Sequence, residues 1–260
     1  MNSAASDSDA LLKVEGLSIS FGGIHAVDNV SFSVRPKGIT SLIGGNGAGK
    51  TTVFNLISGH LRGDSGSITF RGTSIEKMRP SQVARLGVAR AFQDLRLFPR
   101  LTAIDNVLTA IPNQRGENIF TALFGGRRLR EEVAANENRG RTLLNDLAIA
   151  ERADALAENL SYGQQKLLSL GRLLANEGEL LLLDEPTSGI SPQLVSEFCE
   201  RIRDLVRLGK TILLIEHNVE VVMALSDWII VMHQGQVIAE GPPDVIRNNT
   251  AVMHTYLGID

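Results

Sequence analysis

Cysteine and excess positive charge are both scarce in this chain, and each shortage excludes a class of protein. Cys199 is the only cysteine, which excludes an internal disulfide and a zinc site built from cysteines. A reducing compartment such as the cytosol is therefore the expected setting. The 26 Lys and Arg residues are balanced by 29 Asp and Glu residues, a formal net charge of -3, so we expect no nucleic-acid partner.

Long hydrophobic runs are also missing. No apolar stretch approaches the roughly 20 residues that a helix needs to cross a bilayer. The first residues of the chain are polar and carry acids, so we expect no signal peptide there. A protein of this kind would serve a membrane only peripherally, and we expect it on the cytoplasmic side of the inner membrane, docked onto a chain that spans it.

The residues that are present predict an α/β fold. Hydrophobic residues make up 43% of the 260 positions, as in ordinary globular proteins. Short apolar runs predict strands at 17–21, 30–34, 39–43, 67–70, 180–183, 211–215, 228–232 and 236–239. Helical patterns are expected at 53–58, from Ser81 to about Gly87, from Asp105 onward, and at 129–138, 141–148, 162–175 and 192–208.

The order of these segments predicts how the chain is organised. Apolar strands that alternate with helices indicate a parallel sheet covered on both faces. The first strands suggest an antiparallel β subdomain, and residues 94–160 are mainly helical. We therefore expect an α/β core of residues 1–93 and 161–260, interrupted by a helical subdomain at 94–160.

A glycine-rich segment between a predicted strand and a predicted helix matches the pattern G-x-x-x-x-G-K-[ST] of phosphate-binding loops. Backbone N–H groups of such a loop surround a phosphate, and the helix N-terminus adds favourable dipole charge. Lys50 would reach the β- and γ-phosphates, and the Thr51 hydroxyl would ligate Mg²⁺. The candidate nucleotide-binding residues here are Gly44, Gly45, Asn46, Gly47, Ala48, Gly49, Lys50, Thr51 and Thr52.

Two other readings of this loop fail. A dinucleotide-binding fingerprint counted from Gly45 would need a third glycine where Lys50 stands. A small GTPase would read guanine with an Asn-Lys-x-Asp motif, and the sequence contains no Asn-Lys pair. A glycine-rich turn that binds nothing would not explain the lysine, the threonine and the flanking elements together.

Two acids follow the apolar run at 180–183. A rigid buried strand would aim Asp184 at a metal ion, and Glu185 would act on the water that attacks the γ-phosphate. The alternative is a strand that simply ends in solvated acids. The phosphate-binding loop elsewhere in the chain favours the catalytic reading.

The segment from Leu160 to Gln165 opens a helix, and Ser161 with Gln164 forms a capping-box pattern. That pattern gives no reason for Gly163, since glycine in a first helical turn costs about 1 kcal/mol relative to alanine. Bare backbone beside a serine hydroxyl at a helix N-terminus suits a phosphate. Lys50 and the glycine-rich loop would already bind the phosphates of this chain's own nucleotide. We therefore expect the phosphate at this helix to belong to a nucleotide bound by a second copy of the chain.

Together these motifs resemble the ATP-binding subunits of ABC transporters, over about residues 11–258. The family signature Leu-Ser-Gly-Gly-Gln is matched at 160–164, with Tyr162 in place of the first glycine. The resemblance implies a P-loop NTPase core of the RecA-like type and three more site residues. Gln93 would contact Mg²⁺ and the attacking water, His217 would touch the γ-phosphate, and Phe21 would stack on adenine.

The resemblance also implies a mechanism and partners. Two ATP-binding subunits, identical or paralogous, would hold two ATP molecules between them, with Ser161, Gly163 and Gln164 of one facing the phosphate-binding loop of the other. Hydrolysis would open the dimer and act on transmembrane permease subunits, which a periplasmic binding protein supplies with substrate. The permease would dock after Gln93, on Leu95, Leu97, Phe98, Pro99 and Leu101.

The sequence departs from the family pattern at two further places. Gly45 stands where proline is usual, and the segment Ser188-Gly189-Ile190-Ser191 differs from the usual loop after the two acids. Ser191 is predicted only to cap the helix that follows it.

Residues 90–99, 112–130 and 256–258 resemble the LivG-like branched-chain amino acid importer ATPases in particular. Importers of urea and short amides, and the lipopolysaccharide exporter, have related ATPases and remain alternatives. A soluble ABC ATPase of translation or DNA repair would usually carry two cassettes or a long coiled coil. This chain has one phosphate-binding loop and no sustained heptads, so we expect an ATP-hydrolysing importer subunit.

Overall fold

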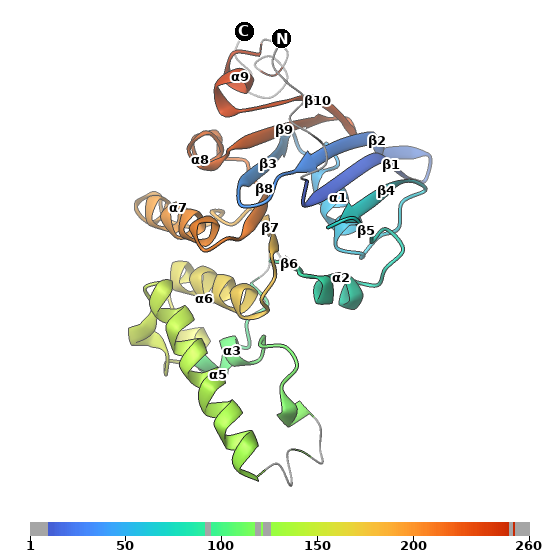
Figure 1. Ribbon diagram of the computed structural model, residues 1–260. Coiled ribbons are helices and arrows are strands. Elements are labelled where there is room, and N and C mark those ends of the chain that lie inside the picture. The colour runs from blue at the N-terminus through green and yellow to red at the C-terminus, as the bar shows by residue number, and fades with distance from the viewer. Residues whose placement is uncertain (1–9, 92–94, 118–120, 122–125, 250–251, 253–260) are drawn as a thin grey trace. The chain divides into compact units, whose positions relative to one another are not determined.

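The computed structural model describes residues 10–91, 95–117, 121, 126–249 and 252. The chain divides into two compact units, and Figure 1 shows the elements of each. The first unit comprises Met1–Arg90, Glu179–Pro186 and Ile202–Asp260, and the second comprises Ala91–Gly178 and Thr187–Arg201.

A six-stranded sheet forms the centre of the first unit, in the order β10-β9-β3-β8-β7-β6. Its strands are β3 (Ile39–Gly44), β6 (Val88–Arg90), β7 (Leu180–Asp184), β8 (Thr211–Ile215), β9 (Trp228–His233) and β10 (Gln236–Gly241). All neighbouring pairs are parallel except β10 with β9. Every residue of β3, β7 and β8 is buried, as expected for a parallel sheet covered on both faces. The predicted parallel core is confirmed.

The second sheet of this unit is antiparallel, in the order β2-β1-β4-β5. Its strands are β1 (Leu12–Phe21), β2 (Ile24–Val34), β4 (Ser65–Phe70) and β5 (Thr73–Ser74). Strands β1 and β2 are longer than the sequence predicted. Polar residues occupy their outward positions, and irregular register interrupts the simple alternation. The predicted N-terminal antiparallel subdomain is nevertheless confirmed.

Helices pack on both faces of the parallel sheet. The first unit contains α1 (Lys50–Ile57), α2 (Pro80–Leu86), α8 (Val219–Leu225) and α9 (Pro243–Arg247). Phe54 of α1 lies in one core cluster with Leu42, and Val222 of α8 lies in another with Ile43. Because successive residues of a strand point to opposite faces, α1 and α8 lie on opposite sides of β3.

Among the residues that the structure describes, the second unit is helical apart from an isolated bridge between Thr102 and Leu156. It contains α3 (Ala103–Leu108), α5 (Gly126–Asp146), α6 (Tyr162–Ala175) and the start of α7 (Pro192–Arg207), with short turns η2 (Arg115–Glu117), η3 (Ala150–Arg152) and η4 (Ala157–Asn159). From the sequence we predicted that the α/β core resumes at Ser161, after the helical subdomain. In the structure α6 packs with α3 and α5, so the first unit resumes only at Glu179.

Helix α5 is a single helix of 21 residues, so the prediction of two helices at 129–138 and 141–148 was wrong. The gap between them fell at Gly140, which is buried inside the helix. A Cβ on Gly140 would lie 2.7 Å from Ile104 Cδ1 of α3. The glycine therefore permits close helix packing, and that packing outweighs its low helix propensity. Among the described residues, none of the helices is both long and apolar enough to cross a membrane.

Truncation of Leu182 tests the placement of the sheet core. Leu182 is fully buried in β7, so Leu182→Ala should lower the free energy of unfolding by about 3 kcal/mol, through lost burial and the cavity left behind. Leu208→Ala is the control, because that side chain is 68% exposed and its loss should change stability by no more than about 0.5 kcal/mol. Urea denaturation measures both, and equal effects would contradict the assigned core.

Candidate functional site

The glycine-rich loop links β3 to α1, and close backbone contacts hold it at both ends. A Cβ on Gly44 would lie 2.2 Å from the carbonyl oxygen of Met232, and one on Gly49 would lie 2.3 Å from that of Ala26. Both glycines also have positive φ, 154° and 98°. No other residue fits these two positions without displacing backbone.

The middle of the loop is open. Gly45, Asn46 and Gly47 are exposed, and a Cβ on either glycine would meet none of the described residues within 4 Å. Ala48 turns back into the core, and its N–H donates to the carbonyl of Gly45 at 3.2 Å. The loop thus presents bare backbone to the outside while its flanks are fixed.

Lys50 is the first residue of α1, and its side chain folds back over the loop. Its Nζ donates to the carbonyl oxygens of Gly44, at 2.8 Å, and of Gly45, at 2.9 Å. Burial lowers the pKa of Lys50, and the negative charges of Glu185 and Asp184 oppose that shift. The ammonium is therefore held at the loop by carbonyl groups that an anionic ligand could replace.

The first turn of α1 carries no acidic residue. Thr51 is exposed there, and Thr52 is half-buried. The partial positive charge of this helix end is therefore not offset by an acid within the helix's first turn. Bare loop backbone, a buried ammonium and an uncompensated helix N-terminus together fit a polyphosphate.

Asp184 ends strand β7, and its carboxylate is paired with the guanidinium of Arg90 at the end of β6. The Arg90 Nη2 lies 3.7 Å from the Asp184 Oδ2, and both side chains are buried. Burial raises the pKa of Asp184, while the guanidinium of Arg90 opposes the rise. Nη1 of Arg90 also donates to the Asn55 Oδ1 at 2.7 Å and the Ser58 Oγ at 3.0 Å. Arg90 thereby ties β7 to helix α1.

Glu185 follows directly and has a left-handed backbone, with φ of 48°. Its N–H donates to the carbonyl of Ile215 at 2.9 Å, which anchors it to the end of β8. Its Oε1 lies 2.8 Å from the His217 Nε2. Glu185 and His217, which were predicted separately from the sequence, are therefore in contact in the structure. The backbone of Glu185 has an uncommon conformation there.

Glu216 positions the histidine. It is 3% exposed, and its Oε2 accepts from the backbone N–H groups of His217, at 2.8 Å, and Asn218, at 3.3 Å. Sequence reasoning missed both Glu216 and Arg90 as contributors to the site. A charged residue directly after the apolar strand β8 is the signal that could have identified Glu216, whereas Arg90 ends a strand of three residues that carries little pattern.

Two further predicted site residues are Phe21, in the first unit, and Gln93, in the second. Phe21 ends β1 beside a glycine turn, pairs with Ile24, and is 47% exposed. An exposed aromatic ring is available for stacking. Gln93 lies outside the described residues.

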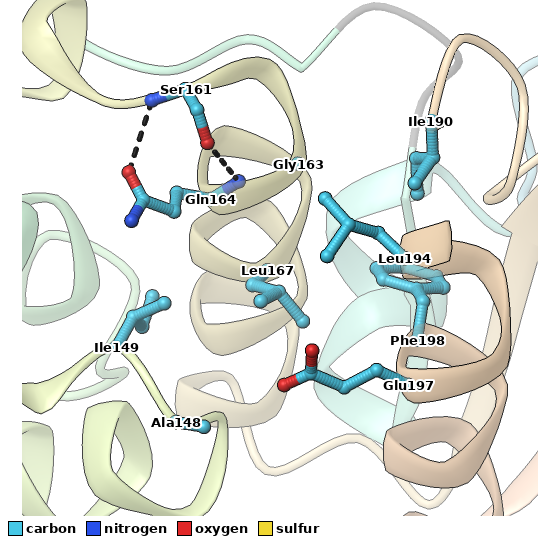
Figure 2. A pocket seen from close by; sticks show the side chains of 10 residues that line it. All are labelled: Ala148, Ile149, Ser161, Gly163, Gln164, Leu167, Ile190, Leu194, Glu197 and Phe198. Carbon is cyan, nitrogen blue, oxygen red and sulfur yellow. Dashed lines mark hydrogen bonds between the residues drawn. The ribbon is translucent and has the colours of Figure 1, made fainter. Parts of the chain in front are cut away.

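Ser161, Gly163 and Gln164 belong to the second unit. The predicted capping box is confirmed: the Gln164 N–H donates to the Ser161 Oγ at 3.3 Å, and the Ser161 N–H donates to the Gln164 Oε1 at 3.0 Å. Figure 2 shows this pair at the start of α6. Gly163 has a packing reason that the sequence did not reveal, since a Cβ there would lie 3.1 Å from the Leu194 Cδ1.

Comparison with known proteins identifies the family. Residues 27–188 match the ABC transporter family. The chain is 42% identical to the high-affinity branched-chain amino acid transport ATP-binding protein LivG of Salmonella typhimurium, over 96% of this chain and 99% of that protein. It is 37% identical to the corresponding protein BraF of Pseudomonas aeruginosa, over 95% of this chain and 98% of that protein.

Solved structures agree with these relatives. An ATP-binding cassette of an ABC transporter in its ADP conformation has a TM-score of 0.82 and 30% identity, covering 96% of this chain and 99% of that one. A nucleotide-free ATP-binding cassette from an ABC transporter also scores 0.82, with 31% identity over 96% of this chain and 100% of that one. The chain therefore belongs to the ABC transporter family, as one of its ATP-binding cassettes.

Proposed function

We propose that this chain binds ATP and hydrolyses it to drive the uptake of branched-chain amino acids through a membrane permease. The observation that carries the proposal is the loop at Gly44–Lys50 with the Glu185–His217 pair, in a chain whose relatives are named as branched-chain amino acid transport ATP-binding proteins. Those names favour this substrate over urea, amides and lipopolysaccharide.

In this proposal the nucleotide is held by the first unit. Phe21 stacks on the adenine, and the phosphates lie against residues 44–52, which include Asn46, Gly47, Ala48 and Thr52. The ammonium of Lys50 exchanges its two carbonyl partners for phosphate oxygens. The Mg²⁺ that accompanies ATP would be held by Thr51, Gln93 and Asp184. When bound, this ion would neutralise charge on the phosphate oxygens.

Glu185 is the proposed base for the attacking water. Its carboxylate orients the water and accepts its proton, and His217 holds the carboxylate through the 2.8 Å contact. Because Glu216 fixes the backbone of His217, the histidine can hold one position while the proton is transferred. Arg90 opposes the rise that burial causes in the pKa of Asp184, and so favours the charged form that a metal ligand needs.

A second ATP-binding subunit, a copy of this chain or a paralogue, completes the proposed assembly. Ser161, Gly163 and Gln164 of one subunit would face the γ-phosphate bound by the other. The permease subunits, supplied by a periplasmic binding protein, would dock on Leu95–Leu101 from the cytoplasmic side. Phe98 in this segment is 47% exposed, and the buried Asn106 braces it by accepting from its N–H at 2.9 Å.

Purification from native membranes tests the whole proposal. A tagged chain extracted in mild detergent should bring multi-span permease subunits and a second ATPase with it, and cells should then be assayed for uptake of leucine and of urea. Copurification with uptake of leucine supports the importer. Recovery of soluble partners alone would remove the transporter assignment while leaving the ATPase chemistry intact.

Replacement of Glu185 tests the proposed base. Glu185→Gln keeps the shape of the side chain and loses the proton acceptor, so hydrolysis should fall by about 10²- to 10⁴-fold. The variant should still bind ATP and accumulate as a dimer in size-exclusion chromatography with MgATP. Glu240→Gln, at an exposed position on β10, should hydrolyse at the normal rate. A Glu185→Gln variant that turned over normally would remove Glu185 from the mechanism.

Replacement of Lys50 tests phosphate binding. Lys50→Met keeps the buried aliphatic volume and loses the ammonium, which is worth about 1.5–3 kcal/mol in a charge-assisted hydrogen bond. Affinity for ATP, measured by titration calorimetry, should therefore fall by about 10- to 100-fold. Lys77→Met, at an exposed position, is the control. Equal affinities for the two variants would exclude Lys50 as a phosphate ligand.

Replacement of Phe98 tests the docking segment. Phe98→Asp should reduce copurification of permease subunits by at least about tenfold, because a buried aromatic anchor often dominates an interface. Val133→Asp is the matched control, since Val133 is 54% exposed on α5 of the same unit. Loss of the permease from both variants, or from neither, would contradict docking at Phe98.

A further inference from the structure

Tyr162, which departs from the family signature, meets the loop before α7 in the second unit. Tyr162 is the first residue of α6, and Gly189 lies in the loop that precedes α7. A Cβ on Gly189 would lie 2.8 Å from Cε1 of Tyr162 and 3.3 Å from both its Cζ and its hydroxyl oxygen. The tyrosine ring therefore lies directly against the backbone of Gly189.

The loop at 188–191 has the local structure of a tight turn. Gly189 has a φ of 74°, and the N–H of Ile190 donates to the carbonyl of Thr187 at 3.2 Å. The carbonyl of Ser191 then accepts from the N–H groups of Leu194, at 2.9 Å, and Val195, at 3.2 Å, as α7 begins. A displacement of Gly189 would therefore be passed on to the first turn of α7.

The ring is restrained from a second direction. The Lys166 Nζ, one helical turn along α6, lies 5.7 Å from the centre of the Tyr162 ring, within the range of a cation–π interaction. Lys166 is only 6% exposed, whereas Tyr162 is 46% exposed. The ring thus packs between a buried ammonium and a glycine while part of it remains accessible.

A cavity lies close to the contact between Tyr162 and Gly189. About 190 Å³ lies between the first turns of α6 and α7, lined by Gly163, Leu167, Ile190 and Phe198 among others. Figure 2 shows Ile190 and Leu194 on the α7 side of this space and Leu167 on the α6 side. Beside this space, the start of α6 contacts the segment that leads into α7 at Tyr162 with Gly189 and at Gly163 with Leu194.

We propose that Tyr162 is a positioning residue that locks the loop at 188–191 to the first turn of α6, so that Ser161, Gly163 and Ser191 form one rigid surface. The contact requires a ring at position 162 and no side chain at position 189. A change at either position releases the same loop. The consequence for hydrolysis rests on the proposed function, whereas the lock itself is a property of the chain without nucleotide.

Hydrogen exchange of the peptide that spans residues 187–195 tests the lock without ATP. Tyr162→Ala and Gly189→Ala should each raise exchange at Ile190 by about tenfold. The double variant should exchange well under a hundredfold faster, because both changes break one contact and only the backbone penalty at position 189 is separate. Tyr162→Phe keeps the ring atoms and should exchange like the wild type. Multiplying effects, or unchanged exchange in Tyr162→Ala, would overturn the lock.

Two further variants keep this test decisive. Gly209→Ala carries a similar backbone penalty, with φ of 87°, and the added Cβ would have no atom of the described part of the chain within 4 Å. The drop in unfolding midpoint of Gly189→Ala should therefore exceed that of Gly209→Ala, and an equal drop would remove Tyr162 as the cause. If Tyr162→Ala does not fold, Tyr162→Leu retains apolar volume without the planar ring and should show the same tenfold effect.

Steady-state kinetics separate the lock from the proposed function. Tyr162→Ala should lower kcat for ATP hydrolysis by about tenfold and leave KM for ATP unchanged, with Tyr162→Phe restoring kcat. An equal rise in KM, or no rescue by phenylalanine, would contradict a positioning role. A wild-type chain without ATPase activity would overturn the proposed function alone, because the exchange cycle does not depend on hydrolysis.

Discussion

Two backbone contacts, Gly44 against Met232 and Gly49 against Ala26, fix the loop on which the candidate site is built. They bind the loop to β9 and β2, one strand from each sheet of the first unit. The tip between them can then stay bare and exposed without losing its position. Directly after the second of these glycines, Lys50 starts α1 and its ammonium donates back to the carbonyls of Gly44 and Gly45.

The charged groups around this loop are supported by partners from distant parts of the chain. Arg90 reaches Asp184 across neighbouring strands and also bonds α1. Glu216 holds the backbone that presents His217 to Glu185. Buried charges are costly unless they are paired and hydrogen-bonded. In this unit each pair uses the ends of parallel strands, where side chains from successive βα connections converge.

The sequence was sufficient for the parallel sheet because fully apolar strands such as β7 and β8 are distinctive. It was also sufficient for the glycine-rich loop and the capping box of Ser161. Prediction from the sequence failed where the role of a residue depends on a neighbour that is distant in the chain. Gly140 was interpreted as a helix break, whereas in the structure it allows Ile104 to pack against its helix. Gly163 had no local explanation in the sequence, and in the structure it lies against Leu194. Short β6 escaped notice because three residues carry little pattern.

The capping box at the start of α6 has a consequence for the kind of ligand that Ser161 can meet. One lone pair of the hydroxyl oxygen already accepts a hydrogen from the N–H of Gln164, while the hydroxyl proton remains available to donate to a ligand. The Gln164 carbonyl is likewise directed to the Ser161 backbone. The capping box therefore occupies part of the acceptor capacity of this helix end and leaves the hydroxyl proton as a donor, which favours an anionic ligand over a cationic one.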